Sequence, residues 1–229
     1  MTFQRARTDE QRTQRRRQIL DTAAAMLRET PVAKLSLNEL SRRTCLAKVN
    51  VLRYFESREA ILLELLDTEL QEWIGELDRT VGSGTGSVTE RGDELATLLA
   101  TSLAARPVLC DLLSAQGAVL ERNISTDLAI GHKHAAQRSL SALRALICRQ
   151  VPELGDTGAG TLIETTLLMA MAAWPCSHPS DAMTAAYASD PALAAMRVNF
   201  IDVVRRTAAV AISGLIVRQH DRPTDLFRP

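Results

Sequence analysis

The sequence predicts an all-α protein, with a small N-terminal domain of three helices and a larger C-terminal helical domain. Hydrophobic residues make up 46% of the 229-residue chain, but aromatic residues make up only 3%. Alanine and leucine favour helices, whereas strands draw on β-branched and aromatic side chains. Apolar residues recur at helical spacing along most of the chain, and no segment predicts a strand.

Charge is distributed unevenly along the chain. The first 58 residues hold thirteen Lys and Arg against six Asp and Glu, a net charge of +7. The remaining residues have a net charge of −7, so the whole chain is neutral. A basic N-terminal segment suits a polyanion, which an acidic body would repel.

The first helix is expected to begin at a capping box formed by Thr8 and Gln11 and to end near Glu29. The residues before it are expected to form a mobile arm that carries Arg5 and Arg7. Its first turns carry a cluster of arginines, Arg12, Arg15, Arg16 and Arg17. These cations oppose the helix dipole, so we expect phosphates near them.

Two short helices joined by a tight turn are predicted for the stretch LSLNELSRRTCLAKVNVLRYFESR. Ser36 and Glu39 have the spacing of a capping box, in which each side chain bonds the N–H of the other residue. This first helix is expected to run to about Arg43, with the turn at Thr44 and Cys45. The second helix is expected to cover residues 47–53.

The outward face of the second helix has the chemistry of base recognition. Leu46, Val51 and Phe55 can pack inward at spacings near one turn. The outward set is then Lys48, Val49, Asn50, Leu52 and Arg53. Lysine can donate to guanine, asparagine can pair with adenine, and valine can touch a thymine methyl group. Without further context, the alternative is a helical hairpin with a solvated polar face.

This segment resembles the DNA-binding domain of TetR-family transcriptional repressors. Their signature reads approximately T-x-x-x-I-A-x-x-A-G-V-S-x-x-T-L-Y-x-x-F-x-S-K-E. The matching residues follow in the same order without a gap, and they are Ser36, Leu40, Ser41, Thr44, Cys45, Leu46, Ala47, Asn50, Val51, Leu52, Phe55, Ser57, Arg58 and Glu59. The resemblance is sharp over about the first quarter of the chain, and the segment YFESRE is its most specific part.

Three departures from the family pattern affect the operator sequence rather than the fold. Cys45 stands where the family has glycine, Leu52 replaces a phosphate-contacting tyrosine, and Asn50 replaces a frequent threonine. If Cys45 adopts positive φ, it costs about 1 kcal/mol relative to glycine. The predicted DNA-binding residues are Ser36, Lys48, Val49, Asn50, Leu52, Arg53, Tyr54 and Arg58. We expect bases to meet residues 48–50, and phosphates to meet Ser36, Arg53, Tyr54 and Arg58.

The domain boundary is predicted between residues 56 and 57. Residues 1–56 form the helix-turn-helix domain with its arm, and residues 57–229 form the helical ligand-binding and dimerisation domain. Ser57 is expected to cap a helix that runs to about Thr80, followed by the loop GSGTGS. The later helices are expected at residues 90–105, 108–120, 125–151, 161–174 and 191–219, with a loop at 152–160 and a loop or short helix at 181–189.

Two of these helices are candidates for a dimer interface. The helix 161–174 offers Ile163, Leu167, Met171 and Trp174, and the last helix offers Phe200, Val204, Ala208, Ala211 and Leu215. Pairing two helices from each subunit gives the four-helix bundle that the resemblance implies. A homodimer also doubles the base contacts on a palindromic site.

The resemblance further implies a small-molecule effector of unknown identity, bound in the C-terminal domain, that lowers DNA affinity. The candidate lining residues are Trp73, Cys110, Leu113, Gln116, Leu120, Met169, Trp174 and Tyr187. The ligand would shift the population toward a geometry in which the two DNA-binding heads are wrongly spaced. The helix from Ser57 to Thr80 would act as the lever.

No motif indicates an enzyme, a cofactor or a metal site. The four cysteines and four histidines fit neither zinc spacing nor a disulfide framework. Glycine-rich phosphate loops and the motifs G-x-S-x-G and H-E-x-x-H are missing. No signal peptide or membrane-length apolar run is present. The prediction is a cytoplasmic regulator whose partners are double-stranded operator DNA, a small molecule and a second copy of itself, with no membrane.

Two other classes remain open. One is a DNA-binding protein that responds to no effector, and the lack of a cavity in the body would favour it. The other is a helical protein-interaction module whose basic head binds an acidic partner. That module would bind DNA weakly and without a preferred palindrome.

Overall fold

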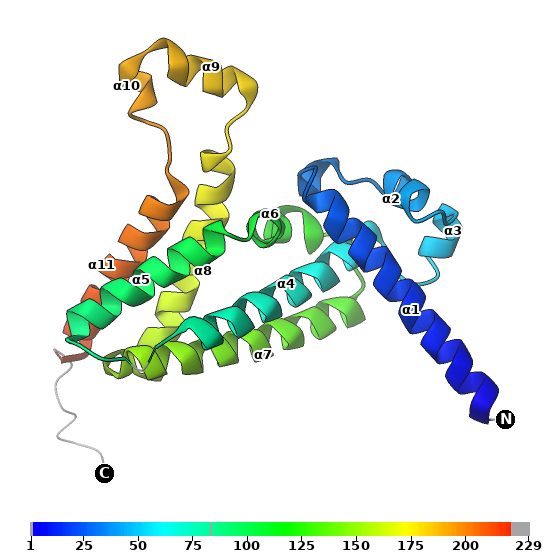
Figure 1. Cartoon of the computed structure of the whole chain (residues 1–229), viewed down its shortest axis with the longest axis horizontal. Helices are drawn as coiled ribbons and strands as arrows, with labels where there is room; N and C mark the ends of the chain where they lie inside the picture. Colours follow the sequence, from blue (N-terminus) through cyan, green and yellow to red (C-terminus); the bar gives the residue numbers. More distant parts are fainter. Residues whose placement is uncertain (1, 83, 221–229) are drawn as a thin grey trace. The chain divides into compact units, whose positions relative to one another are not determined.

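The computed structural model describes the backbone of residues 2–82 and 84–220 and the side chains of residues 10–82 and 84–218. Across these backbone residues the chain forms helices joined by turns, bends and irregular segments and contains no strand, as the sequence predicts (Figure 1). The elements are α1 (Thr2–Leu27), η1 (Val32–Lys34), α2 (Leu37–Arg43), α3 (Lys48–Val51), α4 (Arg58–Thr80), α5 (Val88–Ala104), α6 (Pro107–Ala115), η2 (Gln116–Leu120), α7 (Thr126–Gln150), η3 (Pro152–Leu154), α8 (Gly155–Ser177), α9 (Asp181–Ser189), α10 (Pro191–Ala194) and α11 (Phe200–His220).

Contacts divide the chain into two compact units. The first contains residues 1–71 and 107–136, and the second contains residues 72–106 and 137–229. Both α4 and α7 therefore continue from one unit into the other. The predicted boundary between residues 56 and 57 stays a prediction. It marks the end of the helix-turn-helix segment, whereas this division follows contacts between residues.

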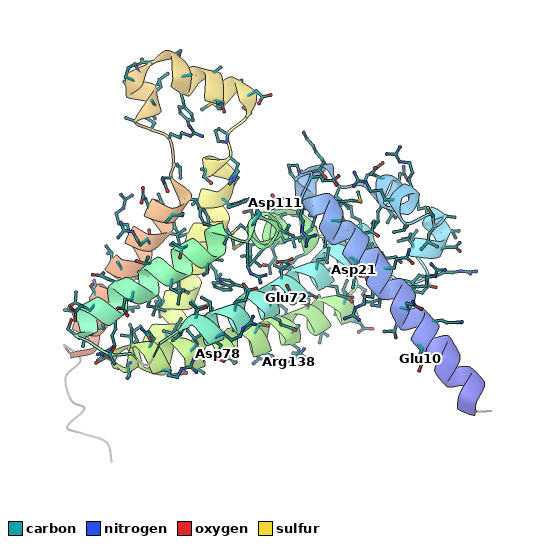
Figure 2. All side chains as sticks on the ribbon, in the orientation of Figure 1. Glu10, Asp21, Glu72, Asp78, Asp111 and Arg138 are labelled. Carbon is teal, nitrogen blue, oxygen red and sulfur yellow. The ribbon has the colours of Figure 1, made fainter. Side chains whose placement is uncertain are left out.

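In the first unit, α1 packs against α2, and α2 packs against α3. The core of this unit includes Ile19, Leu40, Val51 and Phe55, all at most 3% exposed. Leu46, expected to pack inward, is half-buried. Helix α6 packs against η1, and the Asp111 carboxylate (labelled in Figure 2) accepts a hydrogen bond from the Val32 N–H at 2.6 Å.

Local capping signals located several helices correctly. Ser36 precedes α2, and its hydroxyl accepts the Glu39 N–H at 3.2 Å, as predicted. Ser57 precedes α4, and its hydroxyl accepts the Ala60 N–H at 3.0 Å. A complete capping box that the sequence analysis overlooked joins Ser87 and Glu90 at the start of α5.

The N-terminal prediction was wrong. Helix α1 begins at Thr2, so residues 2–8 are helical and Thr8 does not start a helix. The Thr8 side chain, which the expected capping box with Gln11 requires, lies outside the described residues. The side chains of Arg5 and Arg7 lie outside the described residues.

Two predictions in the C-terminal half were also wrong. Helix α8 begins at Gly155, within the expected loop 152–160, because Gly158 and Ala159 are buried in the unit's core. The helix expected at 191–219 is broken into α10 and α11 by a turn at residues 195–196 and an irregular segment that ends at Asn199. The Asn199 side chain caps α11 by accepting the Asp202 N–H at 3.1 Å.

In the second unit, α11 packs against α8 and α5. Phe200, Val204 and Ala208 of the predicted dimer stripe are at most 6% exposed and face the unit's own core, whereas Ala211 and Leu215 are half-buried. The outward apolar residues are instead Leu168 on α8 and Val210 and Val217 on α11, which are 56%, 68% and 59% exposed.

Candidate nucleic-acid interface

Helix α2 begins directly after Ser36, whose extended backbone (φ −114° and ψ 149°) lets its hydroxyl cap the helix N-terminus. The expected reciprocal bond from Glu39 to Ser36 is replaced by bonds from Arg42 at 2.6 Å and from Arg43 at 3.1 Å. These hydrogen bonds from Arg42 and Arg43 lower the pKa of Glu39. The carboxylate thus compensates part of the positive charge at the C-terminal end of α2.

The turn between α2 and α3 depends on one residue in the left-handed region. Cys45 has φ 55°, the only positive value at a non-glycine among the described residues. This confirms that Cys45 occupies a position suited to glycine. The turn directs Lys48 and the residues after it into α3.

Helix α3 exposes the residues that the sequence assigned to base recognition. Val49 is 66% exposed, Lys48 is also exposed, and Asn50 is half-buried. In the described part of the chain, the side chains of Lys48 and Asn50 have no hydrogen-bond or ion-pair partner. Their polar groups are therefore available to an external ligand. Helix α3 is shorter than predicted, because the segment 52–54 continues as turns rather than as α-helix.

The residues after α3 contribute a cation, an aromatic ring and an apolar side chain. Arg53 is exposed, Tyr54 is half-buried, and Leu52 is 40% exposed. Arg53 and Tyr54 line an open hollow of about 1440 Å³ together with residues of α1 and α2. Its other basic lining residues are Arg12, Arg15, Arg17 and Arg43.

A second, smaller hollow of about 330 Å³ lies within the same unit. Its polar and basic lining residues are Lys34, Ser36, Asn38, Lys48 and Arg58. The structure thus brings Ser36 and Lys48 together, although they belong to different elements. Sequence reasoning missed Lys34 and Asn38, which flank the Ser36 cap and could have been found from that position alone.

Two predicted phosphate contacts are instead engaged within the protein. The Arg58 side chain is 19% exposed, and its guanidinium donates to the Val32 carbonyl and pairs with Glu59 at 3.2 Å. Arg16 pairs with Glu64, donates to the Tyr54 carbonyl, and places its guanidinium carbon 4.1 Å from the centre of the Phe55 ring. Arg58 therefore ties the start of α4 to η1, and Arg16 ties α1 to α4 and to the segment that follows α3.

The predicted effector-binding residues do not form one described cavity. Trp73, Cys110, Leu113 and Leu120 are core residues, each at most 4% exposed. Burial raises the pKa of the Cys110 thiol to about 12, so it stays protonated. Gln116, Met169, Trp174 and Tyr187 are half-buried. Trp174 lines a cavity of about 510 Å³ in the second unit.

No group of three His, Cys, Asp or Glu side chains among the described residues could hold a metal ion. In the same part of the chain, no single helix is long and apolar enough to cross a membrane, and only a consecutive helix pair at 88–104 and 107–120 meets that criterion by length and composition.

Comparison with known proteins agrees with this arrangement. Residues 19–65 match a family described as bacterial regulatory proteins, tetR family, and residues 67–219 match one described as tetracyclin repressor-like, C-terminal domain. No curated protein matches the chain. A solved TetR transcriptional regulator from Rhodococcus sp. RHA1 is similar in fold, with 16% identity, a TM-score of 0.53, and coverage of 90% of this chain and 97% of that chain. Because the family models match its N-terminal segment and most of its remainder, the chain belongs to the TetR family of transcriptional regulators.

Proposed function

We propose that the chain is a repressor that binds a palindromic operator as a homodimer and is released by a small molecule. The observation that carries this proposal is the exposed Lys48-Val49-Asn50 face of α3, whose polar groups lack partners among the described residues. A cation, a methyl-bearing side chain and an amide at one helix N-terminus match the base edges of a major groove.

Phosphate contacts are assigned to side chains that line the two hollows. Ser36 and Lys48 line the smaller hollow, and Arg53 and Tyr54 line the larger one. Such contacts fix the position of α3 on the duplex but carry no sequence information. Arg58 is assigned a positioning role, because its guanidinium holds the Val32 carbonyl next to Lys34 and Ser36.

A homodimer is supported by the outward apolar side chains of the last long helices. Leu168, Val210 and Val217 are more than half exposed, although α8 and α11 pack together. Ser213 and Gly214 are small residues that allow close approach beside Val210. A second copy would cover this face and place two copies of α3 on one palindrome.

Release by a ligand would follow from differential binding to two arrangements of the dimer. A small molecule lowers DNA affinity only if it binds the arrangement with misplaced heads more tightly. Helix α4 is the proposed lever, since its residues up to Gln71 belong to the first unit and those from Glu72 to the second.

Selection of preferred sites from random duplex DNA, repeated at two salt concentrations, tests the proposal. The expected result is a palindrome whose half-sites lie about one helical turn apart, roughly 34–36 Å. Recovery of no motif, with binding that vanishes as salt rises, would instead indicate only a basic head on a helical body. In that case the interaction module becomes the better description.

A further inference from the structure

An open surface cavity of about 510 Å³ lies in the second unit, where α8 ends and α11 begins. Figure 1 shows that these two ends carry the chain into and out of α9 and α10. Helix α8 contributes Trp174 and Ser177, and His178 follows directly after it. The segment before α11 contributes Arg197 and Asn199, and Phe200 is the first residue of α11. The volume lies within the range of about 300–1,000 Å³ that is typical of small-molecule pockets.

Three aromatic rings form one side of the cavity. The Trp174 and His178 ring centres lie 4.1 Å apart with planes inclined by 40°. The Trp174 and Phe200 centres lie 5.2 Å apart in an edge-to-face arrangement with an angle of 88°. Because Phe200 is 6% exposed and packs into the core, it holds Trp174 in place and leaves it half-buried at the cavity.

The His178 ring is fixed by local hydrogen bonds. Its Nδ1 lies 2.9 Å from the Trp174 carbonyl oxygen and 3.1 Å from Ser177 Oγ. A carbonyl oxygen can only accept, so Nδ1 carries the hydrogen and donates it. The opposite nitrogen, Nε2, has no partner among the described residues and is available to a bound molecule.

Arg197 supplies positive charge at the same place. Its side chain is exposed, and the described part of the chain offers it no ion pair or side-chain hydrogen bond. The residues that line the cavity include neither Asp nor Glu. The side-chain oxygen of Asn199 accepts a hydrogen bond from the Asp202 N–H at 3.1 Å, and its NH₂ group is left as a donor.

We propose that this cavity binds a small organic anion with a flat apolar body and one carboxylate. The body stacks beside Trp174, and the carboxylate accepts hydrogen bonds from Arg197 and the Asn199 amide. The inference rests on the proposed function, because it assigns this site to the effector that releases DNA. Coupling has a direct route, since Phe200 begins α11, one of the two proposed dimer helices, and Arg197 lies three residues before it.

Titration calorimetry of the full-length protein with 2-naphthoate tests the site, with the neutral 2-naphthamide as the matched ligand. We expect the carboxylate to bind more tightly than the amide by about tenfold, the ratio that 1.4 kcal/mol provides. Arg197→Gln should abolish this preference without weakening the amide, and Arg197→Lys should restore part of it. Trp174→Ala should weaken both ligands.

The control variant is Arg206→Gln, which removes an exposed arginine of α11 that does not line the cavity. It should leave both affinities unchanged. Equal affinity for the acid and the amide, an unaffected Arg197→Gln variant, or no binding of 2-naphthoate would overturn the proposal.

Failure of the site and failure of the regulator proposal are distinguishable. Arg197-dependent binding by a protein that selects no palindrome would retain the cavity but remove the repressor function. A selected palindrome whose affinity is unchanged by saturating 2-naphthoate would retain the repressor but overturn the effector role of this cavity. Release that occurs in the parent protein and is lost in Arg197→Gln would support both.

Discussion

The carboxylate of Glu56 accepts two hydrogen bonds of 2.7 Å from Ser125, one from its N–H and one from its hydroxyl. Ser125 also accepts the Leu128 N–H at 3.2 Å and so begins α7. The turn that follows α3 is therefore tied to the first residues of α7, 69 positions later in the chain.

The Glu56–Ser125 pair should make stability depend on pH. Its hydrogen bonds lower the pKa of Glu56 from the ordinary value of 4.5. The ionised form is thus favoured by folding, and its contribution is complete above that value and lost as the pH falls through the lowered pKa. Glu56→Gln should lower the unfolding temperature at pH 7, and the difference from the parent should shrink on acidification. Glu94→Gln, at an exposed position of α5, is the control and should show no such convergence.

Asn50 should determine one base pair of the operator. We expect Asn50→Ala to relax the preference at that position by ~1–3 kcal/mol, because a bidentate contact to adenine is lost. Competition binding with single-base variants of the selected palindrome measures this loss. Asn123→Ala removes an exposed asparagine that is not part of α3 and should leave every preference intact. An unchanged preference in Asn50→Ala would show that a different register of α3 enters the groove.

Arg58 should contribute mainly to the stability of the fold, and its effect on DNA binding should follow from that contribution. Arg58→Ala removes the donor to the Val32 carbonyl and the pair with Glu59, so unfolding in urea should require about 1–3 kcal/mol less. Arg58→Lys keeps the positive charge but not the forked guanidinium that reaches both partners. If lysine restores DNA affinity without restoring stability, Arg58 contacts phosphate directly. If both remain low, its role is to position the segment around Val32.

Cys45 offers a stabilising substitution. Since its φ is 55°, Cys45→Gly should stabilise the protein by about 0.5–1 kcal/mol, measured as a shift of the urea midpoint. Cys176→Gly is the control, because Cys176 lies within α8, where glycine is a poorer helix former than cysteine and should destabilise the protein by roughly 0.3 kcal/mol. Destabilisation by Cys45→Gly would mean that the thiol contributes more than its backbone strain costs.

The outward face of α8 and α11 should control dimerisation. Val210→Glu and Leu168→Glu each place a charge on the proposed interface, and we expect the dimer dissociation constant to rise by about 10- to 100-fold. Sedimentation equilibrium measures the change. Ile130→Glu alters a residue of α7 that is 50% exposed and should leave the dimer intact. An unaffected dimer in the first two variants would move the interface elsewhere.

Features that depend on neighbouring residues were predictable from the sequence. Ser36 and Ser57 start α2 and α4 through bonds to residues three positions later, so spacing alone located both helices. The sharp turn at Cys45 was likewise evident from the pattern around it. The exposed face at residues 48–50 followed from placing the apolar residues inward.

Features that depend on distant packing were not predictable. Gly158 and Gly160 suggested a loop, but burial of Gly158 and Ala159 keeps that segment helical. Arg58 and Arg16 resemble phosphate-binding residues in sequence, yet their partners Val32 and Glu64 lie 26 and 48 residues away. Such remote hydrogen-bond acceptors determine the orientation of a long arginine side chain. Trp73, Cys110, Leu113 and Leu120 from the effector list lie in the core, and helical spacing alone does not separate a core side chain from one that lines a pocket.

The discontinuous composition of the first unit has a consequence for the order in which the chain acquires structure during synthesis. Residues 1–71 share their compact unit with residues 107–136. On the ribosome, the DNA-binding helices emerge before Asp111 and Ser125 are synthesised. The hydrogen bonds of Val32 and Glu56 to these residues therefore form only later. At 5–20 residues per second, the 65 residues from 71 to 136 take roughly 3–13 s to add. A nascent chain arrested within that interval would carry α3 without the contacts that anchor its surroundings.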